Sequence, residues 1–92
     1  PTQFMKIVYN RLFLKHYKKR IFPDSKLRSR FSDRLKLWEQ DRKNPVLKDH
    51  QLSGIKAEFR SFWINGDVRV VYKPVENDTF EFYDVGRHNQ VY

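Results

Sequence analysis

The sequence contains no cysteine, only three glycines and no long apolar run, and each scarcity excludes a class of protein. Without cysteine there are no disulfides and no thiolate zinc sites, which suits a reducing compartment. The glycines are not clustered, so the glycine-rich loops that bind nucleotide phosphates are absent. No run of about 18 apolar residues and no signal-peptide pattern occur, so we expect a cytoplasmic protein without a membrane span.

The length of 92 residues suits one small domain with a thin core, which we expect to comprise residues 1–92. Hydrophobic residues at 39% and aromatic residues at 16% indicate a folded chain. Met5 is a candidate for the natural start of the protein. In that case residues 1–4 would be a remnant of cloning.

The net charge of +8 is concentrated in the first half of the chain. Residues 1–50 contain 14 lysines and arginines against 5 acidic residues, whereas residues 51–92 contain 5 against 6. This asymmetry favours a polyanionic partner, either a nucleic acid or an acidic protein segment. A helical surface that is simply solvated is the alternative explanation.

Two segments of the first half have the periodicity of amphipathic helices. A short β-type run at 5–10 leads into the first helix at 11–21, and the second helix begins at Pro23 and Asp24 and ends before Pro45. The apolar stripes of the two helices consist of Phe13, Tyr17 and Ile21, and of Leu27, Phe31, Leu35 and Trp38. The opposite face of the second helix carries Lys26, Arg28, Arg30, Arg34 and Lys36.

The second half changes to the period of two that is typical of strands. After a polar loop that ends at Gly54, strands at 55–64 and 67–73 flank the hairpin signal Asn65-Gly66, and a last strand follows at 79–85. The sequence therefore predicts an α+β fold. It has an N-terminal strand, two helices and a three-stranded antiparallel meander, with the helices packed on one face of a four-stranded sheet.

A two-residue turn at Asn65-Gly66 would fix the register of the hairpin. Ile64 would pair with Asp67, Phe62 with Arg69, and Arg60 with Val71. The face covered by the helices would then carry Phe59, Ser61, Trp63, Val68, Val70 and Tyr72, and the other face Arg60, Phe62, Asp67 and Arg69. The arginines of the second face would either pair with Asp67 and Glu58 or bind an anion, and an aromatic ring between guanidinium groups suits an unstacked RNA base.

Three segments, "KDHQLSG", "FRSFWINGDVRVVYK" and "VGRHNQVY", resemble in this order the RelE/ParE superfamily of bacterial type II toxins. The likeness is greatest to the YafQ-like mRNA interferases and is strongest over residues 48–92. The order of the predicted elements is also that of the RelE-like fold. The resemblance implies a toxin of a bacterial or archaeal cytoplasm that needs no cofactor and no metal.

The resemblance further implies cleavage of mRNA, in many members on the ribosome, through attack of the RNA's own 2'-hydroxyl group on the adjacent phosphate. Such a reaction needs a base, an acid and cations that stabilise the pentacoordinate phosphate. The YafQ-like pattern implies His50, Asp67 and His88, with Tyr92 as its terminal aromatic residue. The RelE pattern implies Arg69, Arg60 and the C-terminal tyrosine.

Within this pattern we expect His50 or Asp67 to be the base and His88 the acid. Arg60, Arg69 and Arg87 would stabilise the phosphorane, Tyr92 would stack on or orient a base, and Lys56 and Phe62 would add substrate contacts. Taken alone, His50 is better explained as a plain loop residue beside Asp49, and His16 is expected to be structural. The chain departs from the YafQ-like pattern at Trp63, which stands where those toxins carry a further histidine.

The expected partners are a cognate antitoxin, in a toxin–antitoxin hetero-oligomer, together with mRNA and ribosomal RNA. The antitoxin would cover the basic helices or the arginine face, and the basic helices would contact ribosomal RNA phosphates. Two other hypotheses stay open. One is a ParE-like toxin that acts on gyrase without nuclease chemistry, and the other is a non-catalytic RNA-binding module.

Overall fold

The computed structural model describes residues 5–92, and the predicted cloning remnant at residues 1–4 lies outside them. Strand β1 (Lys6–Tyr9) leads into helix α1 (Arg11–His16), where the side chain of Asn10 accepts a hydrogen bond from the Phe13 amide at 2.9 Å. One turn of π-helix (Tyr17–Ile21) continues α1. The predicted strand and first helix are therefore confirmed.

Helix α2 (Ser25–Gln40) begins where the sequence predicts. The Asp24 carboxylate caps it by accepting hydrogen bonds from the amides of Lys26 at 3.0 Å and Leu27 at 3.1 Å. Phe31 and Trp38 of the apolar stripe are buried. In the part of the chain that the structure describes, no helix is long and apolar enough to cross a membrane.

The second half forms four strands and a short C-terminal helix. These are β2 (His50–Gln51), β3 (Arg60–Trp63), β4 (Val68–Glu76), β5 (Thr79–Arg87) and α3 (His88–Val91). Single turns of 3-10 helix at Pro45–Leu47 and Gly54–Lys56 lie within the predicted loop and at the start of the predicted strand 55–64.

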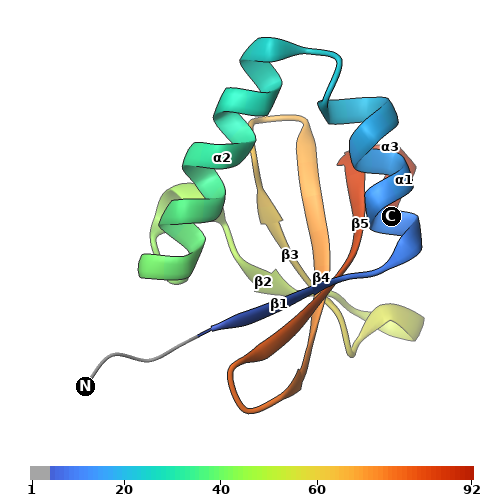
Figure 1. The fold of residues 1–92 in the computed structure, drawn as a ribbon. Coiled ribbons are helices and arrows are strands. Elements are labelled where there is room, and N and C mark those ends of the chain that lie inside the picture. Colours follow the sequence, from blue (N-terminus) through green and yellow to red (C-terminus); the bar gives the residue numbers. More distant parts are fainter. Residues whose placement is uncertain (1–4) are drawn as a thin grey trace.

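The sheet has the order β1-β5-β4-β3-β2, in which β1 runs parallel to β5 and the other neighbours are antiparallel. Figure 1 shows α2 and α1 on either side of the upper part of β3 and β4, with α3 beside the end of β5. The α+β class and the order of elements are confirmed, but the sheet has five strands instead of four. The additional strand, β2, has only two residues, which is too short for a periodic signal.

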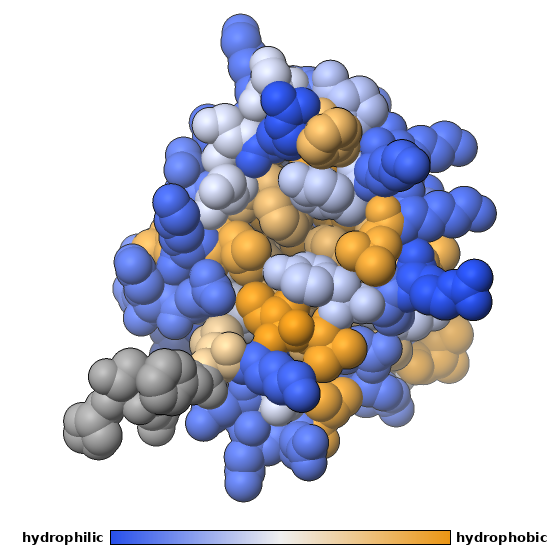
Figure 2. All heavy atoms as spheres, viewed as in Figure 1, coloured by the Kyte–Doolittle hydropathy of each residue, from blue (hydrophilic) through white to orange (hydrophobic). Residues whose placement is uncertain are grey.

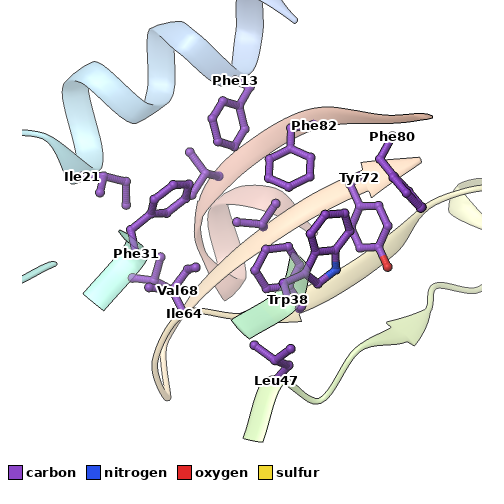
Figure 3. Close-up of a cluster of buried hydrophobic side chains, with 13 residues drawn as sticks. Phe13, Ile21, Phe31, Trp38, Leu47, Ile64, Val68, Tyr72, Phe80 and Phe82 are labelled. Atoms are coloured by element: carbon purple, nitrogen blue, oxygen red, sulfur yellow. The ribbon is translucent and has the colours of Figure 1, made fainter. Parts of the chain in front are cut away.

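The core is built mainly from aromatic rings that α1, α2 and the sheet contribute to one cluster (Figure 3). The fully buried ring of Trp38 stacks on Phe62 with 5.4 Å between centroids and 18° between planes. Tyr72, Phe80 and Phe82 meet the same ring edge to face at 5.0 to 5.2 Å. Large rings supply much apolar area per residue, which compensates for the small size of the domain.

The predicted hairpin register is wrong by one residue. Trp63, not Phe62, lies opposite Arg69, and Phe62 lies opposite Val70. The turn is longer than two residues, because the Ile64 amide donates to the Val68 carbonyl at 2.8 Å and the Asn65 side chain accepts from the Asp67 and Val68 amides.

A shift of one residue exchanges the two faces of a strand. In β3 it places Phe62 in the core and brings Ser61 and Trp63 to the other side of the sheet with Arg69. The faces predicted for Val70 and Tyr72 in β4 are unaffected, since both are fully buried. Burial of Ile64, which has no exposed surface, accompanies the longer turn.

Candidate active site

The hairpin turn and helix α3 bring together three of the predicted site residues. The His88 amide donates to the Asp67 carbonyl at 3.0 Å, and the Arg87 Nε atom lies 3.4 Å from Oδ2 of Asp67. All three side chains are exposed. The Asp67 carboxylate and the Arg87 guanidinium group therefore meet at the surface where β5 ends, and the backbone bond fixes His88 beside them.

The C-terminal tyrosine extends this cluster across the sheet. Its ring meets His88 edge to face, with 4.7 Å between centroids and 90° between planes. The Tyr92 hydroxyl donates to Oγ of Ser61, a fully buried serine of β3. His50 lies directly opposite Ser61 in the β2–β3 pairing, so its side chain points to the same face as that serine.

Arg69 is buried beneath this surface and has few free donors. Its guanidinium nitrogens donate to the carbonyls of Asn65 at 3.0 Å and Gly66 at 3.1 Å, and its Cζ atom lies 3.9 Å from the centroid of the Trp63 ring. The side chain has 6% of its surface exposed. Arg69 therefore fixes the turn that carries Asp67 and is poorly placed to contact a phosphate itself.

Lys56 and His50 have backbone partners near the cluster. The Lys56 ammonium group donates to the Val91 carbonyl of α3 at 2.9 Å, and Nδ1 of His50 is 2.7 Å from the Lys48 carbonyl. The second contact identifies Nδ1 as the protonated nitrogen when His50 is neutral. Its Nε2 atom is then the nitrogen that can accept a proton.

A cleft of about 540 Å³ lies beside the cluster, between α2, the hairpin turn and the start of α3. Its lining is rich in charge. The ionisable side chains in it are Arg20, Asp24, Lys26, Arg30, Asp67 and Arg87. The two acidic groups are outnumbered by the basic ones, so the cleft suits an anion.

Arg60 and Phe62 do not join the site, and their predicted place beside Arg69 is wrong. Phe62 is fully buried in the core. Arg60 lies opposite Tyr72, and its Nε and NH2 atoms bond Oδ1 of Asp49 at 2.8 and 2.7 Å. Because the register is shifted, both residues belong to the face that the helices cover.

The partners of Asp49 explain two shifted pKa values. Burial lowers the pKa of Arg60, but the hydrogen bond and the charge of Asp49 outweigh burial and raise it above its usual range. Burial, followed by the hydrogen bond and the charge of Asp49, raises the pKa of Tyr72 above its usual range. Trp38 also donates to this carboxylate, at 3.1 Å.

Sequence reasoning missed Asp49 and Ser61 as contributors near the site, and it placed Trp63 on the core face of the sheet. In the "KDH" segment the histidine was the predicted site residue, but it is the aspartate that accepts hydrogen bonds from three side chains. A predicted register shifted by one residue would have placed Ser61 and Trp63 on the same face of the sheet as Arg69. His16, expected to be structural, lies 2.6 Å from the buried Asp84 carboxylate.

Among residues 5–92 no group of three or more histidine, cysteine, aspartate and glutamate side chains is arranged for a metal ion. The groups that surround the cluster are proton donors, proton acceptors and cations. This set of groups suits proton transfer at a phosphate diester, where a base removes a proton, an acid supplies one and cations stabilise negative charge.

The sequence matches, over residues 5–92, the family described as bacterial toxin of type II toxin-antitoxin system, YafQ. Comparison with curated proteins gives no match. The fold is similar to several solved structures. A copper-bound mutant toxin from Helicobacter pylori is 26% identical with a TM-score of 0.75, and the match covers 97% of this chain and 100% of that one.

Two further structures share the fold at lower identity. The YoeB/ParE toxin from Agrobacterium tumefaciens is 20% identical with a TM-score of 0.76, over 91% of this chain and 99% of that chain. The toxin in the DinJ-YafQ complex of E. coli is 20% identical with a TM-score of 0.72, over 97% and 99%. The matches extend over nearly the whole chain in each case.

Proposed function

The chain belongs to the YafQ family of toxins from type II toxin–antitoxin systems, and on this premise we propose that it is an endoribonuclease that cleaves mRNA. The substrate is mRNA bound to the ribosome. The nucleophile is the 2'-hydroxyl group of the RNA itself, so the reaction as proposed uses no metal ion. The products carry a 2',3'-cyclic phosphate on one side and a 5'-hydroxyl group on the other.

The exposed groups of the cluster divide the proton transfers between them. His50, through Nε2, or Asp67 removes the proton of the 2'-hydroxyl group, and His88 donates a proton to the leaving 5'-oxygen. Arg87 and Lys56 stabilise the charge that develops on the phosphate. Tyr92, whose ring is partly exposed, orients a base of the substrate, and Arg69 acts through the turn as a positioning residue.

One observation carries the proposal: the chain terminus is bonded to the hairpin turn. The contacts of Asp67 with the His88 amide and with Arg87 bring residues 21 positions apart into one exposed cluster. Residues 88–92 are also bonded to Lys56 and Ser61, so the backbone that carries His88 is held in a defined place.

The test is cleavage of a defined mRNA by the purified protein, with and without ribosomes, for the wild type and His88→Ala. We expect the substitution to lower the cleavage rate by about 100-fold or more, the usual contribution of one acid or base. Asn89→Ala, at the next exposed position of α3, is the matched control and should cleave like the wild type.

Primer extension on cellular mRNA after induction separates this function from the alternatives. A ribonuclease leaves discrete mRNA ends, a toxin that acts on gyrase leaves none, and an RNA-binding module binds RNA without product. Undiminished cleavage in His88→Ala would remove His88 from the mechanism. Absence of any cleavage by the wild type, with or without ribosomes, would reject the ribonuclease itself.

We further propose that an acidic antitoxin covers the groove between α1 and α2. An apolar hollow of about 250 Å³ lies there, lined by Tyr9, Phe13, Leu14, Tyr17 and Phe31. Figure 2 shows an apolar area in the middle of this face, between the positions of α1 and α2 in Figure 1, bordered by hydrophilic side chains. Basic residues around an apolar groove suit an amphipathic acidic segment, and the related toxin of E. coli is found in complex with DinJ.

A further inference from the structure

A second cleft, of about 260 Å³, lies between the middle of α2 and the hairpin turn. Its lining combines three cations with one aromatic ring. The cations are Arg30, Arg34 and Lys48, and the ring is that of Trp63. None of the described residues that line this cleft is acidic.

The three cations lack acidic partners in the described part of the chain. The ion pairs found there involve other basic residues, and Arg30, Arg34 and Lys48 appear in none of them. Three neighbouring positive charges repel one another unless an anion lies between them. A cleft with this lining therefore favours a bound phosphate group.

The ring of Trp63 is held in place before any ligand arrives. The Arg69 guanidinium packs on it at 3.9 Å and is itself fixed by two carbonyls of the turn. Trp63 is only partly buried, and the Lys48 ammonium group approaches the ring to 5.3 Å from an exposed position. A partly exposed, immobilised aromatic ring beside cations is the arrangement on which proteins stack single-stranded bases.

This cleft adjoins the larger cleft beside the candidate active site. Arg30 and Asn65 line both it and the larger cleft that contains Asp67 and Arg87. On its other side the Lys48 carbonyl is bonded to Nδ1 of His50. The cleft therefore lies between the two candidate bases, where a nucleotide next to the scissile phosphate would be placed.

We propose that this cleft is a nucleotide-binding subsite for single-stranded RNA. Arg30, Arg34 and Lys48 bind the backbone phosphate of one nucleotide adjacent to the scissile bond, and Trp63 stacks on its base. The proposal rests on the proposed ribonuclease function. It assigns a binding role to the tryptophan that stands where the YafQ-like pattern has a histidine.

The test uses an RNA hexamer with 2'-O-methyl groups, which lacks the attacking hydroxyl group and so is bound without being cut. Tryptophan emission reports on stacking, because Trp38 is fully buried and Trp63 is the accessible indole. We expect the hexamer to quench the emission of the wild type. Anisotropy of a labelled hexamer should show binding at least about 5-fold weaker for Trp63→Leu.

The phosphate contacts are tested through the salt dependence of hexamer binding. Arg34→Gln should weaken binding and lower the slope of log K against log salt by about 0.7, the value for one phosphate contact in a single strand. Lys43→Gln removes an equal charge from an exposed position that lines neither cleft, and should retain the wild-type slope. Because Arg34→Gln retains Trp63, its salt slope tests the phosphate contacts separately from base stacking.

Any of three results with the hexamer alone would overturn the subsite. They are hexamer binding without quenching, equal affinity of wild type and Trp63→Leu, and equal salt slopes for Arg34→Gln and Lys43→Gln. Loss of antitoxin binding in Arg34→Gln with unchanged hexamer binding would assign the cleft to the antitoxin and reject the proposal. Because the hexamer cannot be cut, a wild type that binds it through Trp63 but cleaves no mRNA would reject the ribonuclease function and leave the subsite standing.

Discussion

At the scale of single residues, Asp49 has the most consequential contacts. Its side chain is 4% exposed and accepts hydrogen bonds from Trp38 of α2, Arg60 of β3 and the Tyr72 hydroxyl of β4. It therefore connects a helix to two strands through one carboxylate. A buried charge is tolerated only when such partners satisfy it, so the four residues depend on one another.

Asp49→Ala should lower the free energy of unfolding by about 2 to 4 kcal/mol, because the indole, guanidinium and hydroxyl groups lose a buried acceptor together. Urea denaturation followed by circular dichroism measures the loss. Glu58→Ala is the matched control, since its carboxylate is 66% exposed and pairs with Lys73 at the surface. Glu58→Ala should lower the free energy of unfolding by less than about 1 kcal/mol. Equal losses of stability in the two variants would contradict the buried network.

At the scale of elements, the junction between β5 and α3 sets the place of His88. Arg20, from the π-helical turn, donates to the Val85 carbonyl at 3.0 Å, and the Gln90 side chain accepts from the Arg87 amide at 2.7 Å. Both side chains lie against Gly86, where an added Cβ would be 2.6 Å from Arg20 NH1 and 2.8 Å from Gln90 Oε1. A side chain at this position would displace both contacts.

Gly86→Ala should therefore destabilise the fold by about 1 to 2 kcal/mol and lower the rate of RNA cleavage, since Arg20 and Gln90 must move away from the start of α3. Thermal unfolding and the cleavage assay measure the two effects. For stability the control is Gly66→Ala, because nothing lies within 4 Å of a Cβ added there. Unchanged stability and cleavage in Gly86→Ala would show that α3 does not depend on the close packing at this glycine.

At the scale of the whole molecule, charge and apolar surface are divided between different regions. The excess of basic residues belongs to residues 1–49, which form β1, α1 and α2, whereas the candidate acid and base groups lie within residues 50–92. The apolar hollow between the helices lies within the basic half. One molecule can thus present a surface for an antitoxin and a separate cluster for RNA chemistry.

Leu14→Asp should weaken the proposed complex with an acidic antitoxin by at least about 10-fold, because a carboxylate would be buried against an acidic partner. Leu14 is 54% exposed in the hollow, so the free protein should still fold. Co-purification and calorimetric titration measure the complex. Ile55→Asp, at an apolar residue that is 99% exposed elsewhere, should bind like the wild type, and equal binding by both variants would place the antitoxin on another surface.

The sequence by itself determined the two long helical segments, four of the five strands of the described residues and the side chains of the core stripes. Those features depend on neighbours within about one or two helical turns, as the cap at Asp24 and the burial of Phe31 and Trp38 show. The order of the motifs also identified His50, Asp67, His88 and Tyr92 as candidates. Their catalytic roles remain predictions that the cleavage assay must test.

Only the tertiary structure decided the register, and with it the surroundings of each arginine. A longer turn at Asn65 differs from a two-residue turn by hydrogen bonds and by the burial of Ile64, none of which leaves a periodic signal in the sequence. The one-residue difference in register places Phe62 in the core and the Trp63 ring against Arg69. The register depends on contacts between segments that are distant in the sequence. A change of one residue in the register moves every side chain of a strand to the opposite face of the sheet.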